Sequence, residues 1–307
     1  MDIALCTDNH YVIPCGVLLC SICENNKNND LQFHIISADL LHANQESLKN
    51  IVTQYRKKIF FHTIKDSKLE KCPAGQKTQN TYIKLATYYR LFLSDILQNI
   101  DKVLYLDCDL LVKHSLIDLW DYDINNYAIG AIPDDDTDDP QMYNRLQYDS
   151  KYGYFNSGVL LINLKYWRKN SLKDELLNYI TQYPERLTYH DQDALNFVMK
   201  NKKKQLPLRY NVQNGFYQKM TSIFKNNEEI KLACKDPYIL HFSGSVKPWF
   251  KECEHPLRNE FFKYLSLTEW KDMQPYHMKM NLKERIWYLQ HKISIWRSYF
   301  NSKIISK

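Results

Sequence analysis

The order of short apolar segments and amphipathic segments is the feature that most constrains this fold. Predicted strands cover residues 2–7, 31–37, 58–64, 102–106, 128–132 and 159–163, and predicted helices cover 14–23, 43–55 and 87–97. Strands that alternate with helices favour a mainly parallel sheet covered by helices on both faces, an α/β fold. Because ligands bind beyond the carboxyl ends of the strands in such sheets, the residues that follow each strand are the candidates for a site.

The net charge of +6 is confined to the end of the chain. Residues 279–307 contain seven Lys or Arg residues and one acidic residue, so residues 1–278 contain 34 basic and 34 acidic residues. The neutral main part, which carries no recognised nucleic-acid motif, argues against nucleic acid as a partner. The chain has only 7 glycines and neither of the two common glycine-rich nucleotide motifs, so a glycine loop that cradles phosphate is not expected.

Two further classes are disfavoured by the sequence. The longest charge-free apolar stretch, residues 11–23, is shorter than the roughly 20 residues that span a membrane. The first residues lack the basic segment of a secretory signal. We therefore expect a protein that is neither secreted nor integral to a membrane, with its eight cysteines as reduced thiols. Cys20 and Cys23 are interpreted as packing residues on a helix.

Acidic side chains follow several predicted strands. Asp8 follows the first strand, Asp107 and Asp109 follow the strand at 102–106, and Asp134 follows the strand at 128–132. Residues two apart in an extended chain project to the same side, so Asp107 and Asp109 can point at one spot while Cys108 turns away. Two converging carboxylates require a cation or a proton. We interpret the pair as a candidate metal site, with a solvated turn as the alternative; residues 135–139 are expected in a solvated loop.

Five blocks of this sequence resemble glycosyltransferase family 8. They are residues 87–91, 105–112 with the Asp-x-Asp motif, 155–168, 190–196 and 241–249. They follow the family's order and spacing over residues 1 to about 250, and the likeness is greatest to bacterial lipopolysaccharide galactosyl- and glucosyltransferases. These are retaining enzymes that use a UDP-sugar and a divalent metal on a GT-A fold. The resemblance implies a Rossmann-like catalytic domain over residues 1–250 and a C-terminal helical extension over 251–307.

The resemblance also implies which residues hold the metal and the nucleotide. The metal ligands would be Asp107, Asp109 and His241, and the imidazole favours Mn²⁺ over the alternative, Mg²⁺. The nucleotide-binding residues would be Asp8, Tyr11, Asp107, Gly244 and Lys247. Lys247 is expected to clamp the pyrophosphate with its charge, and Gly244 would allow close approach of the backbone. His10 stands where relatives often have Asn, so the contact to the base or ribose can differ from theirs.

The donor sugar would be held by Arg90, Asp134, Asn156, Asp191 and Gln192. Gln192 occupies the place of a nucleophile below the anomeric carbon, yet an amide is a poor nucleophile compared with a carboxylate. Either Gln192 stabilises a short-lived oxocarbenium ion during same-face attack, or Asp191 or Asp193 contributes as a catalytic carboxylate. Same-face attack is the favoured interpretation.

The last segment has the pattern of one amphipathic helix. Its apolar stripe comprises Leu282, Ile286, Leu289, Ile293, Trp296 and Phe300, with basic residues on its flanks. Residues 279–307 either lie on an anionic membrane surface or pack on the catalytic domain. We therefore expect transfer of galactose or glucose from UDP-galactose or UDP-glucose to a lipid-linked saccharide, at the cytoplasmic face of the plasma membrane, as in lipopolysaccharide synthesis. The alternatives are a glucosyltransferase acting on a protein or soluble glycan, and a non-catalytic protein that binds sugar nucleotides or membranes.

Overall fold

A seven-stranded sheet of order β3-β2-β1-β4-β7-β6-β8 forms the centre of the computed structural model. The structure describes residues 1–65, 69, 72, 85–219, 227–281, 283, 285, 286, 288 and 289. The strands of this sheet are β1 (Asp2–Cys6), β2 (Gln32–Ser37), β3 (Lys58–Thr63), β4 (Lys102–Leu106), β6 (Ile129–Pro133), β7 (Phe155–Asn163) and β8 (Lys203–Gln205). A smaller sheet joins β5 (Leu110–Val112), β10 (Ile239–His241) and β9 (Val212–Gln213).

The expected α/β class is confirmed, and the main sheet is mixed but mostly parallel. The pairs β1–β2, β2–β3, β1–β4 and β6–β8 are parallel, whereas β7 runs antiparallel to both β4 and β6. All nine residues of β7 are buried, and the strand begins four residues before the predicted segment. Because β7 is antiparallel, its first residues lie at the same edge of the sheet as the carboxyl ends of β4 and β6.

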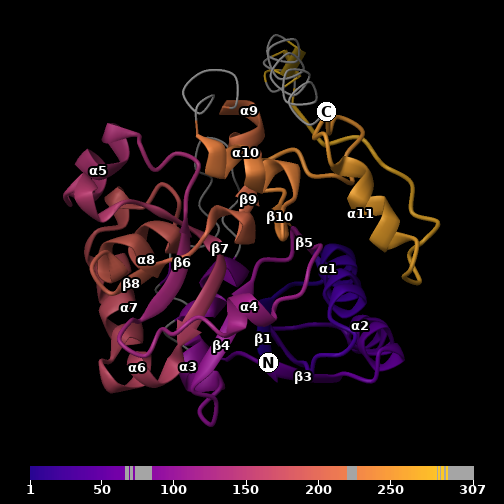
Figure 1. Ribbon diagram of the computed structural model, residues 1–307, viewed down its shortest axis with the longest axis horizontal. Helices are drawn as coiled ribbons and strands as arrows, with labels where there is room; N and C mark the ends of the chain where they lie inside the picture. The colour runs from indigo at the N-terminus through magenta and orange to yellow at the C-terminus, as the bar shows by residue number, and fades with distance from the viewer. Residues whose placement is uncertain are drawn as a thin grey trace.

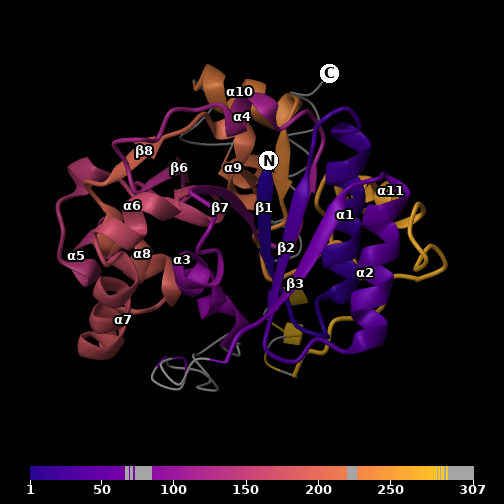
Figure 2. The ribbon, with the colours of Figure 1, turned by 90° about the horizontal axis from the view of Figure 1, so that it is seen from below.

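Helices cover both faces of the sheet (Figures 1 and 2). The α-helices are α1 (Val12–Asn25), α2 (His42–Gln54), α3 (Leu93–Ile96), α4 (Ile117–Trp120), α5 (Pro140–Leu146), α6 (Leu164–Lys169), α7 (Leu172–Gln182), α8 (Asp191–Met199), α9 (Asn214–Lys219), α10 (Glu228–Lys235) and α11 (Arg258–Leu265). Short 3₁₀ helices are η2 (Leu85–Phe92), η3 (Ser150–Tyr152), η4 (Pro184–Arg186) and η5 (Leu208–Tyr210). One core cluster packs α1, α2 and α11 against β1 and β2, and a second packs η2, α3, α6, α7 and α8 against the opposite face.

The predicted helix at 87–97 is instead a 3₁₀ helix, η2, followed by the short α3. Five consecutive side chains, from Tyr88 to Phe92, are buried. A surface α-helix buries one stripe of side chains at a spacing of three or four. The spacing of the apolar positions therefore predicted the wrong type of helix for residues 87–92.

Helix α11 and Trp270, in the chain after residue 250, pack on the sheet domain. Helix α11 contacts α1, and a Cβ at Gly16 of α1 would overlap the Trp270 ring. All eight cysteines are free thiols, as expected, and Cys20 and Cys23 are buried on α1. Within the described residues, no helix is long and apolar enough to cross a membrane.

Most of the predicted amphipathic helix lies outside the described residues. Of its apolar stripe, only Ile286 and Leu289 are described, and their exposed fractions are 47% and 66%. The hydroxyl of Tyr288 donates a hydrogen bond of 3.0 Å to the backbone oxygen of Glu252. Tyr288 therefore contacts the rest of the protein, while the neighbouring apolar side chains of Ile286 and Leu289 face solvent.

Candidate active site

A cavity of about 670 Å³ opens beyond the carboxyl ends of β1, β4 and β6. Such a volume is typical of pockets that bind small organic ligands. The predicted residues that line it are Asp8, Tyr11, Arg90, Asp107, Asp109, Asp134, Asn156, Asp191, Gln192 and Gly244. Asp135 and Asp136 also line it, so the solvated loop predicted after Asp134 begins later in the chain. The cavity thus lies where the sequence predicted a site, beyond the carboxyl ends of the strands.

At one end of the cavity, a tight turn links β1 to α1. The Asp8 carboxylate accepts hydrogen bonds of 2.8 and 2.9 Å from the backbone nitrogens of His10 and Tyr11. The Asn9 side chain instead binds Leu41 and Asn44 beside the start of α2, and His10 is exposed. Asp8 thus fixes the turn, which places Tyr11 at the cavity wall.

The Tyr11 side chain contacts Trp249 and lines the cavity. It meets Trp249 edge to face, with ring centroids 5.7 Å apart. Burial raises the pKa of Tyr11 to about 12, so its hydroxyl stays protonated at neutral pH. A neutral aromatic ring held at a cavity wall is suited to stack on a planar base.

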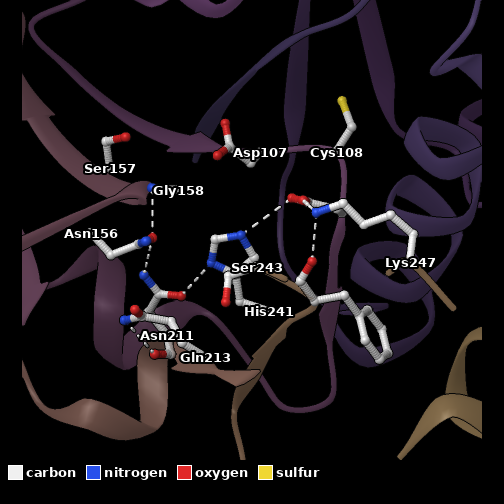
Figure 3. Close-up of polar contacts among 12 residues, drawn as sticks. Asp107, Cys108, Asn156, Ser157, Gly158, Asn211, Gln213, His241, Ser243 and Lys247 are labelled. Atoms are coloured by element: carbon white, nitrogen blue, oxygen red, sulfur yellow. Dashed lines mark hydrogen bonds and ion pairs between the residues drawn. The ribbon is translucent and has the colours of Figure 1, made fainter. Parts of the chain in front are cut away.

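Asp107, Asp109 and His241 lie together, with their ligand atoms within 4.8 Å of one another. The register of the small sheet explains this, because His241 at the end of β10 pairs with Leu110 of β5, next to Asp109. The Asp109 carboxylate lies 3.3 Å from His241 Nε2 and 2.6 Å from Lys247 Nζ (Figure 3). Cys108 turns away, as predicted, and its thiol donates to the backbone oxygen of Cys6.

The charges around Asp109 keep it ionised. Burial alone would raise the pKa of Asp109, but Lys247 and His241 hold it well below its usual range. Lys247 also donates a bond of 2.7 Å to the backbone oxygen of Phe242. Two carboxylates and an imidazole are a donor set that suits a divalent transition metal. The residues present therefore fit the metal expected from the sequence.

Arg90 joins this group to the opposite side of the cavity. It is buried, with its guanidinium 2.9 Å from Asp107 Oδ1, 3.0 Å from Asp191 Oδ2 and 2.6 Å from the backbone oxygen of Ser157. Its guanidinium also lies 4.4 Å from the centre of the Tyr105 ring. Burial opposes the charge, but Asp107 and Asp191 raise the pKa of Arg90 above its usual value. Arg90 is therefore a fixed charge between two acidic groups.

Asp191 and Gln192 begin helix α8 at the cavity. Burial raises the pKa of Asp191 to about 7, despite the neighbouring Arg90. The Gln192 amide oxygen accepts a bond of 2.9 Å from the Ser157 backbone nitrogen. Its nitrogen donates bonds of 3.2 Å to the Asp134 carboxylate and to the Tyr154 hydroxyl. The amide of Gln192 is thus held in one orientation.

Asp193 lies behind the cavity wall. Its fully buried carboxylate accepts bonds of 2.7 and 3.0 Å from Arg145, one of 2.8 Å from the Tyr154 hydroxyl and one of 2.6 Å from the Tyr189 backbone nitrogen. Of the three catalytic candidates, the structure therefore brings Asp191 and Gln192 to the cavity and leaves Asp193 in an ion pair.

The family follows from a comparison with known proteins. Residues 2–253 match the model of glycosyl transferase family 8.

The chain belongs to glycosyltransferase family 8.

This family 8 enzyme is 28% identical over 277 residues to "General stress protein A" of Bacillus subtilis (strain 168), a match that covers 88% of the chain and 94% of the relative. It is 33% identical over 257 residues to a "Putative glycosyltransferase" of Haemophilus influenzae, which covers 83% and 74%. It is 26% identical over 289 residues to the lipopolysaccharide 1,3-galactosyltransferase of Salmonella typhimurium (strain LT2), which covers 88% and 79%. The crystal structure of the galactosyltransferase LgtC, with donor and acceptor sugar analogs, matches with a TM-score of 0.77 and 26% identity, covering 93% of this chain and 99% of LgtC.

Three residues of this family 8 enzyme escaped the sequence analysis. Ser157 orients Gln192, and it lies in the recognised block at 155–168. Tyr154 stands directly before that block and contacts both Gln192 and Asp193. Arg145, the partner of Asp193, lies in α5, where no motif marks it. A buried aspartate implies a cationic partner, but only the fold identifies which residue supplies it.

Proposed function

We propose that this enzyme transfers galactose or glucose from a UDP-sugar to a hydroxyl group of a saccharide, with retention of the anomeric configuration. One observation carries the proposal: Arg90 bridges Asp107 of the candidate metal group and Asp191 of the candidate sugar site within one cavity. This arrangement supports a diphosphate-binding end and a hydroxyl-binding end a short distance apart. The galactosyltransferase relatives support the choice of donor.

The diphosphate would lie against Asp107, Asp109, His241 and Lys247. A divalent metal bound there supplies positive charge that stabilises the departing diphosphate. Burial opposes the charge of Lys247, but Asp109 raises its pKa, so this lysine stays charged at neutral pH. Its charge beside Asp109, which lines the cavity, and the Gly244 backbone at the cavity wall support a role in binding the phosphates. Asp8 and Tyr11 would hold the uridine at the neighbouring wall.

The sugar would lie between Arg90, Asp134, Asn156, Asp191 and Gln192. In the proposed step, the acceptor oxygen forms a bond to the anomeric carbon as the bond from that carbon to the UDP oxygen breaks. The acceptor proton passes to the departing phosphate on the same face of the sugar. Gln192 stabilises the positive charge on the ring through its amide dipole. The burial of Asp193 in an ion pair supports same-face attack over a covalent route through that carboxylate.

A screen of UDP release tests the proposal. UDP-galactose and UDP-glucose, each with and without Mn²⁺, are supplied with a panel of saccharides, and released UDP is measured. We expect release with one of these donors that depends on the metal. If folded protein binds UDP but releases none from any donor, the proposed activity is wrong and the non-catalytic alternative remains. Release stimulated by a soluble glycan or a protein would favour the other alternative.

The metal assignment has its own variant and control. Asp109→Asn should abolish the metal-dependent part of UDP binding measured by calorimetry, because a ligand charge next to His241 is lost. Asp101→Asn is a matched control: Asp101 is 68% exposed, pairs with Arg168 and precedes β4, at the opposite end of the strand from Asp107. UDP binding that still depends on Mn²⁺ in Asp109→Asn would reject the assignment.

We further propose that residues 279–307 bring the enzyme to an anionic membrane surface at the cytoplasmic face, where a lipid-linked saccharide is the acceptor. The exposure of Ile286 and Leu289 and the match to lipopolysaccharide glycosyltransferases support this proposal. Removal of residues 279–307 should release the protein from anionic liposomes and spare donor hydrolysis. If the full-length protein does not sediment with these liposomes, the membrane proposal is wrong.

A further inference from the structure

A chain of buried amide side chains links the sugar side of the cavity to His241 (Figure 3). The Asn156 oxygen accepts bonds from the Gly158 backbone nitrogen, at 3.0 Å, and from Asn211 Nδ2, at 2.9 Å. Asn211 Oδ1 lies 2.9 Å from His241 Nδ1. Asn211 is completely buried and does not line the cavity, so ligand contact does not account for it.

The chemistry of these groups allows only one orientation along the chain. A backbone N–H only donates, so the Asn156 oxygen faces Gly158, and the Asn156 nitrogen donates to the Asp134 carboxylate at 3.1 Å. Asn211 must then present its nitrogen to the Asn156 oxygen. Its own oxygen is left facing His241 Nδ1, which must therefore carry a proton. Nε2, the atom that faces Asp109, is then the nitrogen whose proton a metal ion would displace; without a metal that proton can be donated to the Asp109 carboxylate 3.3 Å away.

Gly158 leaves the space that this arrangement needs. A Cβ at residue 158 would lie 2.5 Å from His241 Cε1, 3.0 Å from Asn156 Oδ1 and 3.1 Å from Asp107 Oδ2. The position therefore touches the imidazole, the amide chain and a candidate metal ligand at once. Any side chain there would displace His241 or Asp107.

We propose that Asn211 is a positioning residue that fixes the Nδ1–H tautomer and the ring plane of His241, so that Nε2 is presented to the metal. Because Asn211 also holds Asn156, it couples the metal site to the donor-sugar site. A partner that fixes the tautomer of a metal-binding histidine typically changes metal affinity about 10- to 100-fold when it is lost. The coupling rests on the proposed function, whereas the tautomer does not.

Nitrogen-15 NMR of histidine-labelled, metal-free protein tests the tautomer directly. The signals of His241 are assigned by their absence in His241→Ala. We expect Nδ1 of His241 to carry a proton in the wild type and in Asn211→Asp, which keeps an oxygen for Nδ1–H, and to be only partly protonated in Asn211→Leu. An unprotonated Nδ1 in the wild-type histidine would overturn the proposal without any need for a variant.

Mn²⁺ binding in the presence of UDP, measured by electron paramagnetic resonance, tests the consequence. We expect Asn211→Leu to bind Mn²⁺ about 10- to 100-fold more weakly than the wild type, and Asn211→Asp less than about 10-fold more weakly. Gly158→Ala retains every hydrogen-bonding group but displaces the ring, so it should weaken binding as well. Asn163→Leu is the matched control, because Asn163 is a buried asparagine at the other end of β7 that caps α6.

Two results separate failure of this inference from failure of the proposed function. Folded Asn211→Leu with wild-type Mn²⁺ affinity would overturn the positioning role. If Asn163→Leu weakens Mn²⁺ binding to the same extent, lost stability explains the weaker binding and the contact between Asn211 and His241 does not. Wild-type protein that binds UDP but no Mn²⁺ would overturn the metal-dependent function and the coupling, while the NMR result would still decide the tautomer.

Discussion

The buried ion pair between Asp193 and Arg145 offers the clearest prediction, because Asp193 was a catalytic candidate that the structure places away from the cavity. Asp193→Asn keeps the shape of the side chain but removes its charge. Breaking a buried ion pair on one side costs about 3–5 kcal/mol. Since the Arg145 side chain is 23% exposed and can be partly hydrated, we expect a loss of about 3 kcal/mol. For a chain of this size, this lowers Tm by about 5 °C.

Thermal unfolding and steady-state kinetics are measured on the same variant. The asparagine oxygen can still accept a bond from Tyr154, so Gln192 should be only slightly displaced. We expect kcat to fall by no more than about 100-fold, the scale of a small misplacement. In the double variant Asp193→Asn with Arg145→Met, both charges are gone, and the loss of stability should shrink to about 1 kcal/mol or less.

Two outcomes would refute this reasoning. A loss of activity on the order of a million-fold at unchanged Tm, as when a nucleophile is removed, would make Asp193 a catalytic carboxylate. Stability losses that simply add in the double variant would show that Arg145 and Asp193 do not interact. Asp191→Asn is the comparison at the cavity itself, since Asp191 contacts Arg90.

Two further predictions concern stability. His255 is buried between the rings of Tyr217 and Phe242, and burial lowers its pKa to about 3. Unfolded histidine titrates near pH 6.5, so the unfolded state binds the extra proton between about pH 6.5 and 3, and stability falls by about 1.4 kcal/mol for each unit of acidification in that window. His255→Phe should therefore flatten the acid dependence of the urea midpoint, and an unchanged slope would contradict the assigned cause. Gly16→Ala should cost about 1–3 kcal/mol by forcing Trp270 off α1; an unchanged Tm would show that this contact contributes nothing.

The relative positions of site residues could be predicted best where the residues are close together in the sequence. Asp107 and Asp109 directly follow β4, so their place at the edge of the sheet follows from the end of that strand. Cys108 and Asp109 lie in a turn, however, so the two-residue period of an extended chain does not account for their convergence. Helix α8 shows the limit of such reasoning. Asp191 and Asp193 are separated by about 200° around a helix axis, since each residue turns it by about 100°. Only one of the two can face the cavity, and the packing of α8 on the sheet selects Asp191.

The sequence by itself determined the α/β class, the edge of the sheet that carries the cavity, the family and most of the residues around the cavity. These follow from local periodicity and from short motifs, which the chain carries wherever it folds. Only the tertiary structure decided the antiparallel direction of β7, the partner of Asp193 and the contact between Asn211 and His241. Strand direction and contacts between distant residues depend on how whole elements pack, and no local pattern encodes them. The amide chain that orients His241 exists because β7, the residue before β9 and the end of β10 bring Asn156, Asn211 and His241 together.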